Sequence, residues 1–280
     1  MRLPALACRP SPVRWFQFAG GGGRFLAADL EGRRSMDESS AQVIVLAAGR
    51  GSRLDGLAGT RCKALLDLGA RPLLQRAIDF AATLGASEVI VVGGYRIEQV
   101  RAFIAGLRAP RIRLVENPRY GAGNLLSLQA ALPLVCGSFY LTNVDHVFSA
   151  AAARRVLSGI GEDITAFCEF TRTLAADEMK VVLDAQGCVR DIAKTLVDFD
   201  GGYIGLTHVP QRRLADYRAA ADRTHERADD AAVAEQVLQT LAGAGSRVRA
   251  ASLDGIAWCE IDTPHDYRRA QAMLAHGRLE

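Results

Sequence analysis

The 280-residue sequence lacks the features that would place it in several classes of protein. No run reaches the ~18 uninterrupted apolar residues that a membrane-spanning helix needs. The 27 glycines follow no three-residue period, which excludes a collagen-like chain, and a hydrophobic content of 49% excludes a largely disordered one. The six cysteines form no Cys-x-x-Cys pair, and the five histidines do not lie at zinc-ligand spacings from them. We therefore expect a globular cytoplasmic protein with reduced thiols.

The chain also lacks a strong excess of charge of one sign. Its net charge is +3, but six of the 34 basic residues and only two of the 31 acidic residues fall within residues 1–35. The remaining chain holds 28 basic and 29 acidic residues. A body with this balance has no electrostatic basis for coating nucleic acid, so we expect no nucleic-acid partner.

The N-terminal segment shows no lasting helical or strand period. Prolines and a run of four glycines interrupt it, and it has no clean apolar core of a secretory signal. We expect a disordered extension over residues 1–40 and a folded domain over residues 41–280. Met36 opens a polar run directly before the first predicted strand, so a translation start at Met36 is the alternative, and whether residues 1–35 belong to the native protein stays open.

Short apolar runs alternate with longer amphipathic stretches from residue 42 onward. The first half predicts strands over 43–46, 88–92, 112–115 and 138–141 and helices over 72–84, 97–107 and 125–132. The second half predicts strands over 164–170, 180–183, 189–193 and 203–207, helices over 212–221 and 231–241, strands near 248 and 257, and a helix from Pro264. Apolar strands alternating with helices indicate a parallel sheet covered on both faces. We predict an α/β fold with Rossmann-like α/β/α layers, in which a mostly parallel mixed sheet carries a small antiparallel extension.

A glycine-containing loop directly follows the first predicted strand. It reads Leu46-Ala47-Ala48-Gly49-Arg50-Gly51-Ser52-Arg53-Leu54. Small residues at such a turn let backbone N–H groups approach a phosphate closely. A dinucleotide-binding loop would have a third glycine at Leu54, and a P-loop would require Gly-Lys-Ser/Thr, so neither motif fits. Taken alone, the loop is also compatible with a plain glycine turn.

Together with Lys63 and the run Leu65-Leu66-Asp67-Leu68-Gly69, the loop resembles the signature of nucleotidyltransferases that activate sugar phosphates, phosphocholine or inositol phosphate. The resemblance covers about residues 42–270. It implies catalytic roles for Arg53 and Lys63, which would neutralise the triphosphate and stabilise charge at the α-phosphorus. It also implies a set of nucleotide-binding residues: Leu46, Ala47, Ala48, Gly49, Gly51, Ser52, Gly94, Gly123 and Asn124. For Asn124, a simple helix N-cap is the alternative.

Two aspartates directly follow predicted strands, Asp145 before His146 and Asp262 before Thr-Pro. Each alone is a candidate helix N-cap. The family places its metal-binding carboxylates at these two motifs, so the resemblance implies that Asp145 and Asp262 bind Mg²⁺, a cation that prefers carboxylates and phosphate oxygens. His146 either orients Asp145 or faces solvent.

The order of motifs most resembles that of inositol-1-phosphate cytidylyltransferases and of bacterial phosphocholine cytidylyltransferases. It implies that the phosphate of a small phosphorylated alcohol, held by Lys180 and Lys194, attacks the α-phosphorus of CTP and releases pyrophosphate. Surface charge is the alternative for both lysines. Where inositol relatives tend to have Asp-Thr-Gly, this chain has Gly201-Gly202-Tyr203, which leaves the acceptor open. A sugar-1-phosphate nucleotidyltransferase using UTP, dTTP or GTP and a catalytically silent nucleotide-binding module are the alternatives, and the oligomeric state stays open.

Overall fold

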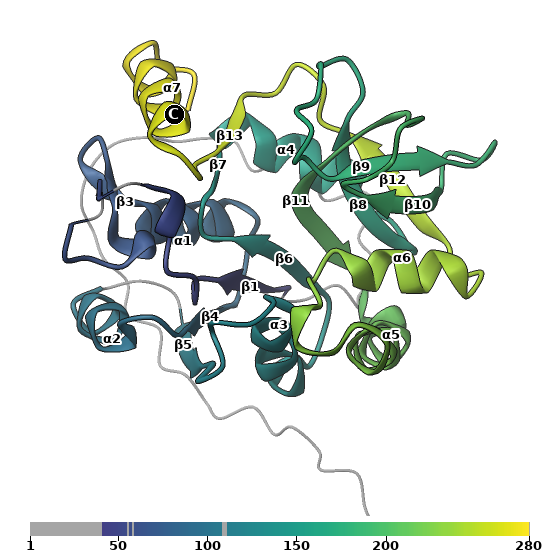
Figure 1. The fold of residues 1–280 in the computed structure, drawn as a ribbon, viewed down its shortest axis with the longest axis horizontal. Coiled ribbons are helices and arrows are strands. Elements are labelled where there is room, and N and C mark those ends of the chain that lie inside the picture. Colours follow the sequence, from purple (N-terminus) through teal and green to yellow (C-terminus); the bar gives the residue numbers. More distant parts are fainter. Residues whose placement is uncertain (1–40, 55, 58, 108–110, 280) are drawn as a thin grey trace, which may run out of the picture. The chain divides into compact units, whose positions relative to one another are not determined.

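The computed structural model describes residues 41–54, 56–57, 59–107 and 111–279 of the chain. The expected extension over residues 1–40 lies outside this described part. Within it, nine strands form one sheet in the order β10-β9-β11-β6-β1-β4-β5, with β8 joined to β11 and β12 joined to β8 (Figure 1). The nine strands are β1 (Gln42–Leu46), β4 (Glu88–Gly93), β5 (Arg111–Glu116), β6 (Phe139–Asn143), β8 (Ile164–Glu169), β9 (Lys180–Leu183), β10 (Val189–Ala193), β11 (Gly201–Val209) and β12 (Val248–Ser252).

The sheet has a parallel half and a largely antiparallel half. Strands β6, β1, β4 and β5 are parallel neighbours. Strand β11 runs antiparallel to β6 and carries β8 and β9 antiparallel to itself, and β10 is antiparallel to β9, whereas β12 is parallel to β8. Because the carboxyl ends of β1 and β6 lie side by side, loops that follow these two strands meet at one edge of the sheet. The predicted mixed sheet with an antiparallel extension is confirmed.

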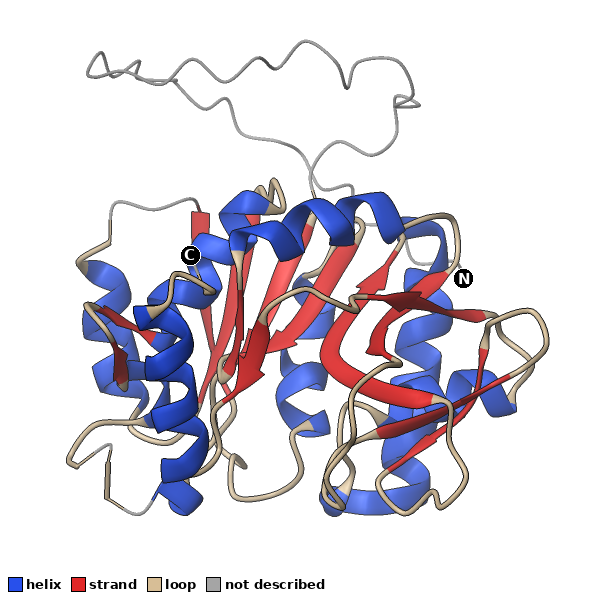
Figure 2. Ribbon diagram, turned by 90° about the horizontal axis from the view of Figure 1, so that it is seen from above, coloured by secondary structure: helices blue, strands red, loops and turns tan. Residues whose placement is uncertain are grey.

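The described part has seven α-helices, and helices lie on both faces of this sheet, as Figure 2 shows. They are α1 (Leu73–Thr83), α2 (Ile97–Ala105), α3 (Leu125–Ala131), α4 (Ala150–Gly159), α5 (Leu214–Ala228), α6 (Gln236–Gly243) and α7 (Pro264–Ala275). Val43 and Val45 of β1 enter a core shared with α1, α2, α4 and α7, while Ile44 and Leu46 enter a second core with α3, α5 and α6. A strand whose alternate side chains enter two cores is apolar throughout, which is why β1 is a continuous hydrophobic run.

Two small sheets complete the described fold. One pairs β2 (Asp67–Leu68) with β3 (Arg71–Pro72), and the other pairs β7 (His146–Phe148) with β13 (Trp258–Glu260). Neither β7 nor the β2–β3 pair was predicted, because two or three residues are too short to show a period. Helix α4 was also missed. No helix of the described residues is long and apolar enough to cross a membrane.

The prediction for the helices after β11 was partly wrong. The helix predicted to end at residue 221 continues to Ala228 in α5, and the next helix begins at Gln236 rather than at residue 231. The last turns of α5 read Asp-Arg-Thr-His-Glu-Arg-Ala, and their polar side chains give no apolar period for sequence analysis to follow.

The buried His208 on β11 predicts a pH-dependent stability. Burial lowers the pKa of His208 to about 4, and its Nδ1 has no hydrogen-bond partner among the described residues. The unfolded chain holds histidine near its usual pKa of about 6.5, so between these values the unfolded state binds more protons than the folded state. The free energy of unfolding therefore falls as pH drops through this window, by at most about 1.4 kcal/mol per pH unit.

Urea unfolding of the protein and of His208→Leu between about pH 7 and pH 4.5 measures this effect. Subtracting the two series removes the contributions of the other titrating groups. A difference that does not vary with pH would contradict the buried neutral state of His208.

Candidate functional site

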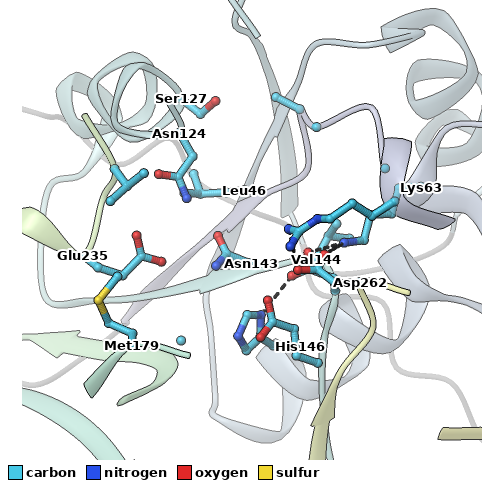
Figure 3. Close-up of a pocket in the computed structure, with 18 of the residues that line it drawn as sticks. Leu46, Lys63, Asn124, Ser127, Asn143, Val144, His146, Met179, Glu235 and Asp262 are labelled. Carbon is cyan, nitrogen blue, oxygen red and sulfur yellow. Dashed lines mark hydrogen bonds and ion pairs between the residues drawn. The ribbon is translucent and has the colours of Figure 1, made fainter. Parts of the chain in front are cut away.

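A pocket of about 390 Å³ lies at the carboxyl ends of β1 and β6 (Figure 3). Leu46 ends β1, Asn143 ends β6, and both line it. The pocket brings together most residues that the sequence predicted for the site: Leu46, Ala48, Gly49, Gly51, Ser52, Arg53, Lys63, Asn124, Asp145, Lys194 and Asp262. Four predicted residues do not line it: Ala47, Gly94, Gly123 and Lys180.

The glycine loop is held against β4 by its own backbone. The N–H of Ala47 donates to the carbonyl of Val92 at 2.8 Å, so Ala47 lies beneath the loop rather than in the pocket. Gly51 has a φ of +67°, and a Cβ at this position would lie 2.8 Å from Cβ of Lys63. Glycine at 51 therefore serves both the left-handed turn and the close approach of Lys63.

Lys63 joins the two predicted metal-binding aspartates. Its Nζ lies 2.5 Å from Oδ2 of Asp145 and 2.5 Å from Oδ1 of Asp262. Nη2 of Arg53 contacts the other oxygen of Asp262 at 2.6 Å. The two carboxylates thus converge on one cationic group at the end of the glycine loop.

The β7–β13 pair positions these two aspartates. Asp145 directly precedes β7, and Asp262 is the second residue after β13. The strands pair with Glu260 opposite His146, and the N–H of Ile261 donates to the carbonyl of Asp145 at 3.0 Å. Asp262 is not a helix N-cap, because Thr263 caps α7 in a capping box with Asp266.

The charges of this cluster stabilise one another. Burial alone disfavours the charged form of Lys63, but the charges of Asp145 and Asp262 outweigh it and raise the pKa of Lys63. Burial also opposes ionisation of Asp145, yet the charge of Lys63 and the hydrogen bond from His146 hold its pKa well below the usual range. At neutral pH, Lys63 is therefore an ammonium and Asp145 a carboxylate.

His146 orients Asp145 and does not face solvent, which decides between the two predicted alternatives. Its Nδ1 lies 2.9 Å from Oδ1 of Asp145, which leaves Oδ2 for Lys63, and the imidazole is only 6% exposed. The ring stacks on Trp258 with an interplanar angle of 1° and a centroid distance of 5.9 Å. On β11, Gly205 has a φ of +72°, and a Cβ there would overlap Nε2 of His146.

Glu260 is a residue of the site that the sequence analysis missed. One potential metal-ligand atom from each of Asp145, His146 and Glu260 lies within 4.8 Å of the other two. Burial, with the nearby charges of Asp145 and Asp262, raises the pKa of Glu260 to about 7, and the charge of His146 opposes this. The signal lay in the two-residue period of Trp258, Glu260 and Asp262, which all line the pocket.

The other side of the pocket carries further acidic groups. Asp177, Glu178 and Glu235 line it with Lys194 and Tyr203. The sequence analysis named none of these three acids, because no motif marks them. They come from the segment before β9 and the segment before α6, which only the folded chain brings together.

Two predicted nucleotide-binding glycines act through packing. A Cβ at Gly94 would lie 2.5 Å from Cβ of Tyr120, which itself lines the pocket, and a Cβ at Gly123 would overlap the backbone of Ala232. Asn124 begins α3, but its side chain makes no cap hydrogen bond and accepts instead from the N–H of Ala234 at 2.8 Å. Gly123 and Asn124 thereby fix the segment before α6 against the pocket.

Lys180 is not among the residues that line the pocket, and its contact with an acceptor stays a prediction. Its Nζ donates to the carbonyls of Ala176 and Lys194 at 2.9 and 2.7 Å, and its side chain is buried. The ammonium therefore fastens the segments that flank β9 and β10. Lys194 is exposed and lines the pocket, and its contact with an acceptor stays a prediction.

Residues 43–175 match the family model described as the MobA-like NTP transferase domain. The predicted resemblance is thereby confirmed.

Two curated relatives match most of the chain. A bifunctional IPC transferase and DIPP synthase of Rubrobacter xylanophilus is 31% identical over 233 residues, which are 82% of this chain and 51% of the relative. A CMP-5'-(3-aminopropyl)phosphonate synthase of Streptomyces rubellomurinus is 29% identical over 253 residues, with 84% and 39% of the two chains covered. The chain thus spans about half the length, or less, of these relatives.

Solved structures share the fold. The inositol-1-phosphate CTP transferase from T. maritima superimposes with a TM-score of 0.73 at 18% identity, covering 86% of this chain and 98% of the other. The CTP:phosphocholine cytidylyltransferase LicC of Streptococcus pneumoniae gives 0.67 at 23% identity, covering 84% and 99%. These likenesses confirm the predicted fold class.

The contact between Gly205 and His146 predicts the effect of a single methyl group. In Gly205→Ala, the added Cβ must displace the imidazole, and we expect a loss of about 1–3 kcal/mol in the free energy of unfolding beyond backbone strain. Gly187→Ala is the matched control, because Gly187 also has a positive φ, +74°, but a Cβ there meets nothing within 4 Å. Urea unfolding measures both, and equal losses would show that His146 does not need the space at Gly205.

Proposed function

We propose that this chain is a Mg²⁺-dependent cytidylyltransferase that transfers CMP from CTP to the phosphate of a small acceptor. The observation that carries this proposal is the convergence of Asp145 and Asp262 on one cationic group beside the glycine loop. Nucleotidyl transfer requires such an arrangement, because its catalysis depends on positioning and on neutralising phosphate charge.

In this proposal the glycine loop and two cations hold the triphosphate. Gly49, Gly51 and Ser52 line the pocket with small or absent side chains, so their backbone lies within reach of phosphate oxygens. Arg53, 60% exposed, is free to turn from Asp262 towards a phosphate. Lys63 keeps its charge at neutral pH because its pKa is raised, and it would stabilise charge at the α-phosphorus.

The donor set of the pocket fits Mg²⁺. Two carboxylates already share one cation, the Lys63 ammonium, and Mg²⁺ is typically bound by one or two carboxylates together with phosphate oxygens. Asp145 and Asp262 would hold the ion, with His146 fixing the orientation of Asp145. When bound, Mg²⁺ would offset the negative charge of the triphosphate.

The reaction needs no covalent enzyme intermediate. An oxygen of the acceptor phosphate attacks the α-phosphorus of CTP and forms a new P–O bond. The bond between the α-phosphorus and the bridging oxygen breaks, and pyrophosphate leaves with that oxygen. The acceptor phosphate is already a nucleophile, so the side chains position the reactants rather than activate one of them.

The relatives support CTP and a small phosphorylated acceptor. The solved structures that share the fold include enzymes named for transferring from CTP to inositol 1-phosphate and to phosphocholine. A curated relative is named for a CMP-linked product. Inositol 1-phosphate, or a similar small phosphorylated alcohol, is therefore our first acceptor.

The acidic side of the pocket favours a second candidate acceptor, one that carries an amine. Glu235 lines the pocket, and no hydrogen bond or ion pair of its side chain is found among the described residues (Figure 3). Asp177 and Glu178, the latter paired with Arg172, add acidic groups, against the one cation Lys194 among the described lining residues on this side. The relative named for a 3-aminopropylphosphonate product points the same way.

A panel of nucleotides against acceptors tests the proposed function. Pyrophosphate release is measured with CTP, UTP, dTTP and GTP, each with inositol 1-phosphate, phosphocholine, 2-aminoethylphosphonate and glucose 1-phosphate. We expect release with CTP and with inositol 1-phosphate or an amine-bearing acceptor. Release with another nucleotide and glucose 1-phosphate would replace the proposal by a sugar-phosphate nucleotidyltransferase, and CTP binding without release would identify a silent module.

The assignment of Asp145 predicts a large loss of activity with little change of fold. Asp145→Asn removes one of the two charges that face Lys63 and the metal, so turnover should fall at least about 100-fold. Asp216→Asn, on the exposed face of α5 in an ion pair with Arg213, is the matched control and should keep its activity. Circular dichroism checks the fold, and full activity of Asp145→Asn would overturn the metal assignment.

A further inference from the structure

The segment between β8 and β9, residues 170–179, forms one wall of the pocket. We call it the acceptor-side loop. Asp177, Glu178 and Met179 line the pocket from it. Figure 3 shows Met179 across the pocket from Lys63. In-line transfer needs the attacking and leaving oxygens on opposite sides of the α-phosphorus, so a wall facing the triphosphate side is where the acceptor enters.

One side chain of this loop, Arg172, contacts residues from three parts of the fold. Nη1 and Nη2 of Arg172 donate to the two carboxylate oxygens of Glu178 at 3.1 and 2.6 Å, and its Nε donates to Glu169 at 2.8 Å. The guanidinium carbon also lies 5.7 Å from the ring centroid of Trp258. Glu178 and Trp258 both line the pocket, whereas Arg172 does not.

The loop is fastened at both ends. Oδ1 of Asp254 accepts from the N–H groups of Phe170 and Thr171 at 2.8 and 3.2 Å. At the other end, the N–H of Tyr203 on β11 donates to the carbonyl of Met179 at 2.8 Å, and within the loop the N–H of Ala175 donates to Glu178 at 2.5 Å. Backbone hydrogen bonds to carboxylates are charge-assisted and stronger than neutral ones, so the wall is built before an acceptor arrives.

Gly201 and Gly202 of β11 allow the acceptor-side loop to lie close to the sheet. A Cβ at Gly201 would lie 2.5 Å from Cδ1 of Phe170, and a Cβ at Gly202 would lie 2.7 Å from Cδ2 of Leu174. Any side chain at these positions would push the loop away from the sheet. Gly201-Gly202 is the point at which this chain departs from the pattern of inositol relatives, and the departure serves the seating of this loop.

We propose that Arg172 is a positioning residue that sets acceptor specificity. It fixes the Glu178 carboxylate and the Trp258 indole as a rigid wall against which the acceptor binds. By pairing with both oxygens of Glu178, it offsets a negative charge that would otherwise repel the acceptor phosphate. This inference rests on the proposed function, since it takes the acceptor to be a small phosphorylated molecule.

The proposal predicts different effects on the KM for the acceptor and the KM for CTP. None of the partners of Arg172 belongs to the glycine loop, so its loss should weaken acceptor binding and leave nucleotide binding unchanged. In Arg172→Gln we expect the KM for inositol 1-phosphate or 2-aminoethylphosphonate to rise about 10-fold or more, with the KM for CTP unchanged. Arg172→Lys keeps the charge but not the two-pronged contact, so it should recover part of the loss.

Trp258 gives a readout that does not require turnover. The chain has two tryptophans, so Trp15→Phe leaves Trp258 as the sole indole. In that background, inositol 1-phosphate and 2-aminoethylphosphonate, each with CTP and Ca²⁺ in place of Mg²⁺, should change the Trp258 emission. The midpoint, the acceptor concentration that gives half of the emission change, should rise about 10-fold in Arg172→Gln. Arg212→Gln is the matched control, because Arg212 contacts a carbonyl and a carboxylate of Glu162 at the opposite end of β8.

The outcomes separate this inference from the proposed function. If the parent protein releases no pyrophosphate, the proposed function fails, and the Trp258 midpoints still decide the role of Arg172. Equal midpoints and equal acceptor KM values in Arg172→Gln and the parent overturn the inference while leaving the activity intact. An unchanged Trp258 emission with every probe overturns it as well, and so does a rise of the KM for CTP that equals the rise for the acceptor.

Discussion

The ion pairs of Lys63 with Asp145 and Asp262 are the constraint on which the site depends. Two carboxylates brought this close would repel each other, and the ammonium between them turns that repulsion into attraction. The remaining features serve this contact. Gly51 lets the loop reach Lys63, and the β7–β13 pairing sets the two aspartates side by side. These ion pairs hold the two carboxylates side by side at the end of the glycine loop.

The pocket divides into two halves with different physical demands. The half at β1 includes glycine, alanine and serine residues of the glycine loop, whose backbone lies within reach of a ligand. The half at β11 and β13 is made of long side chains, held by charge-assisted hydrogen bonds and ring stacking. In the proposed function, the first half would bind the nucleotide and the second half the acceptor.

Much of the fold and the nucleotide half could be predicted from sequence, because both are local patterns. Strand β1 is a continuous apolar run, and the glycine loop with Lys63 is a compact motif. Arg172 and Glu235 could not be found this way, because their places in the site arise from contacts between segments far apart in the chain. Lys180 stands at the expected place in the motif, but its hydrogen bonds to three carbonyls in a buried setting could not be predicted from the sequence.

The position of Asp262 has a consequence for how the protein matures. One carboxylate of the pair follows β6, but the other comes from the segment between β13 and α7, which the ribosome makes last among the pocket residues. The nascent chain can assemble the parallel strands and the glycine loop well before Asp262 has emerged. During that interval Lys63 has one acidic partner instead of two. The pair of carboxylates is therefore complete only once the segment after β13 has been made, and a chain interrupted before β13 has the glycine loop and Asp145 without Asp262.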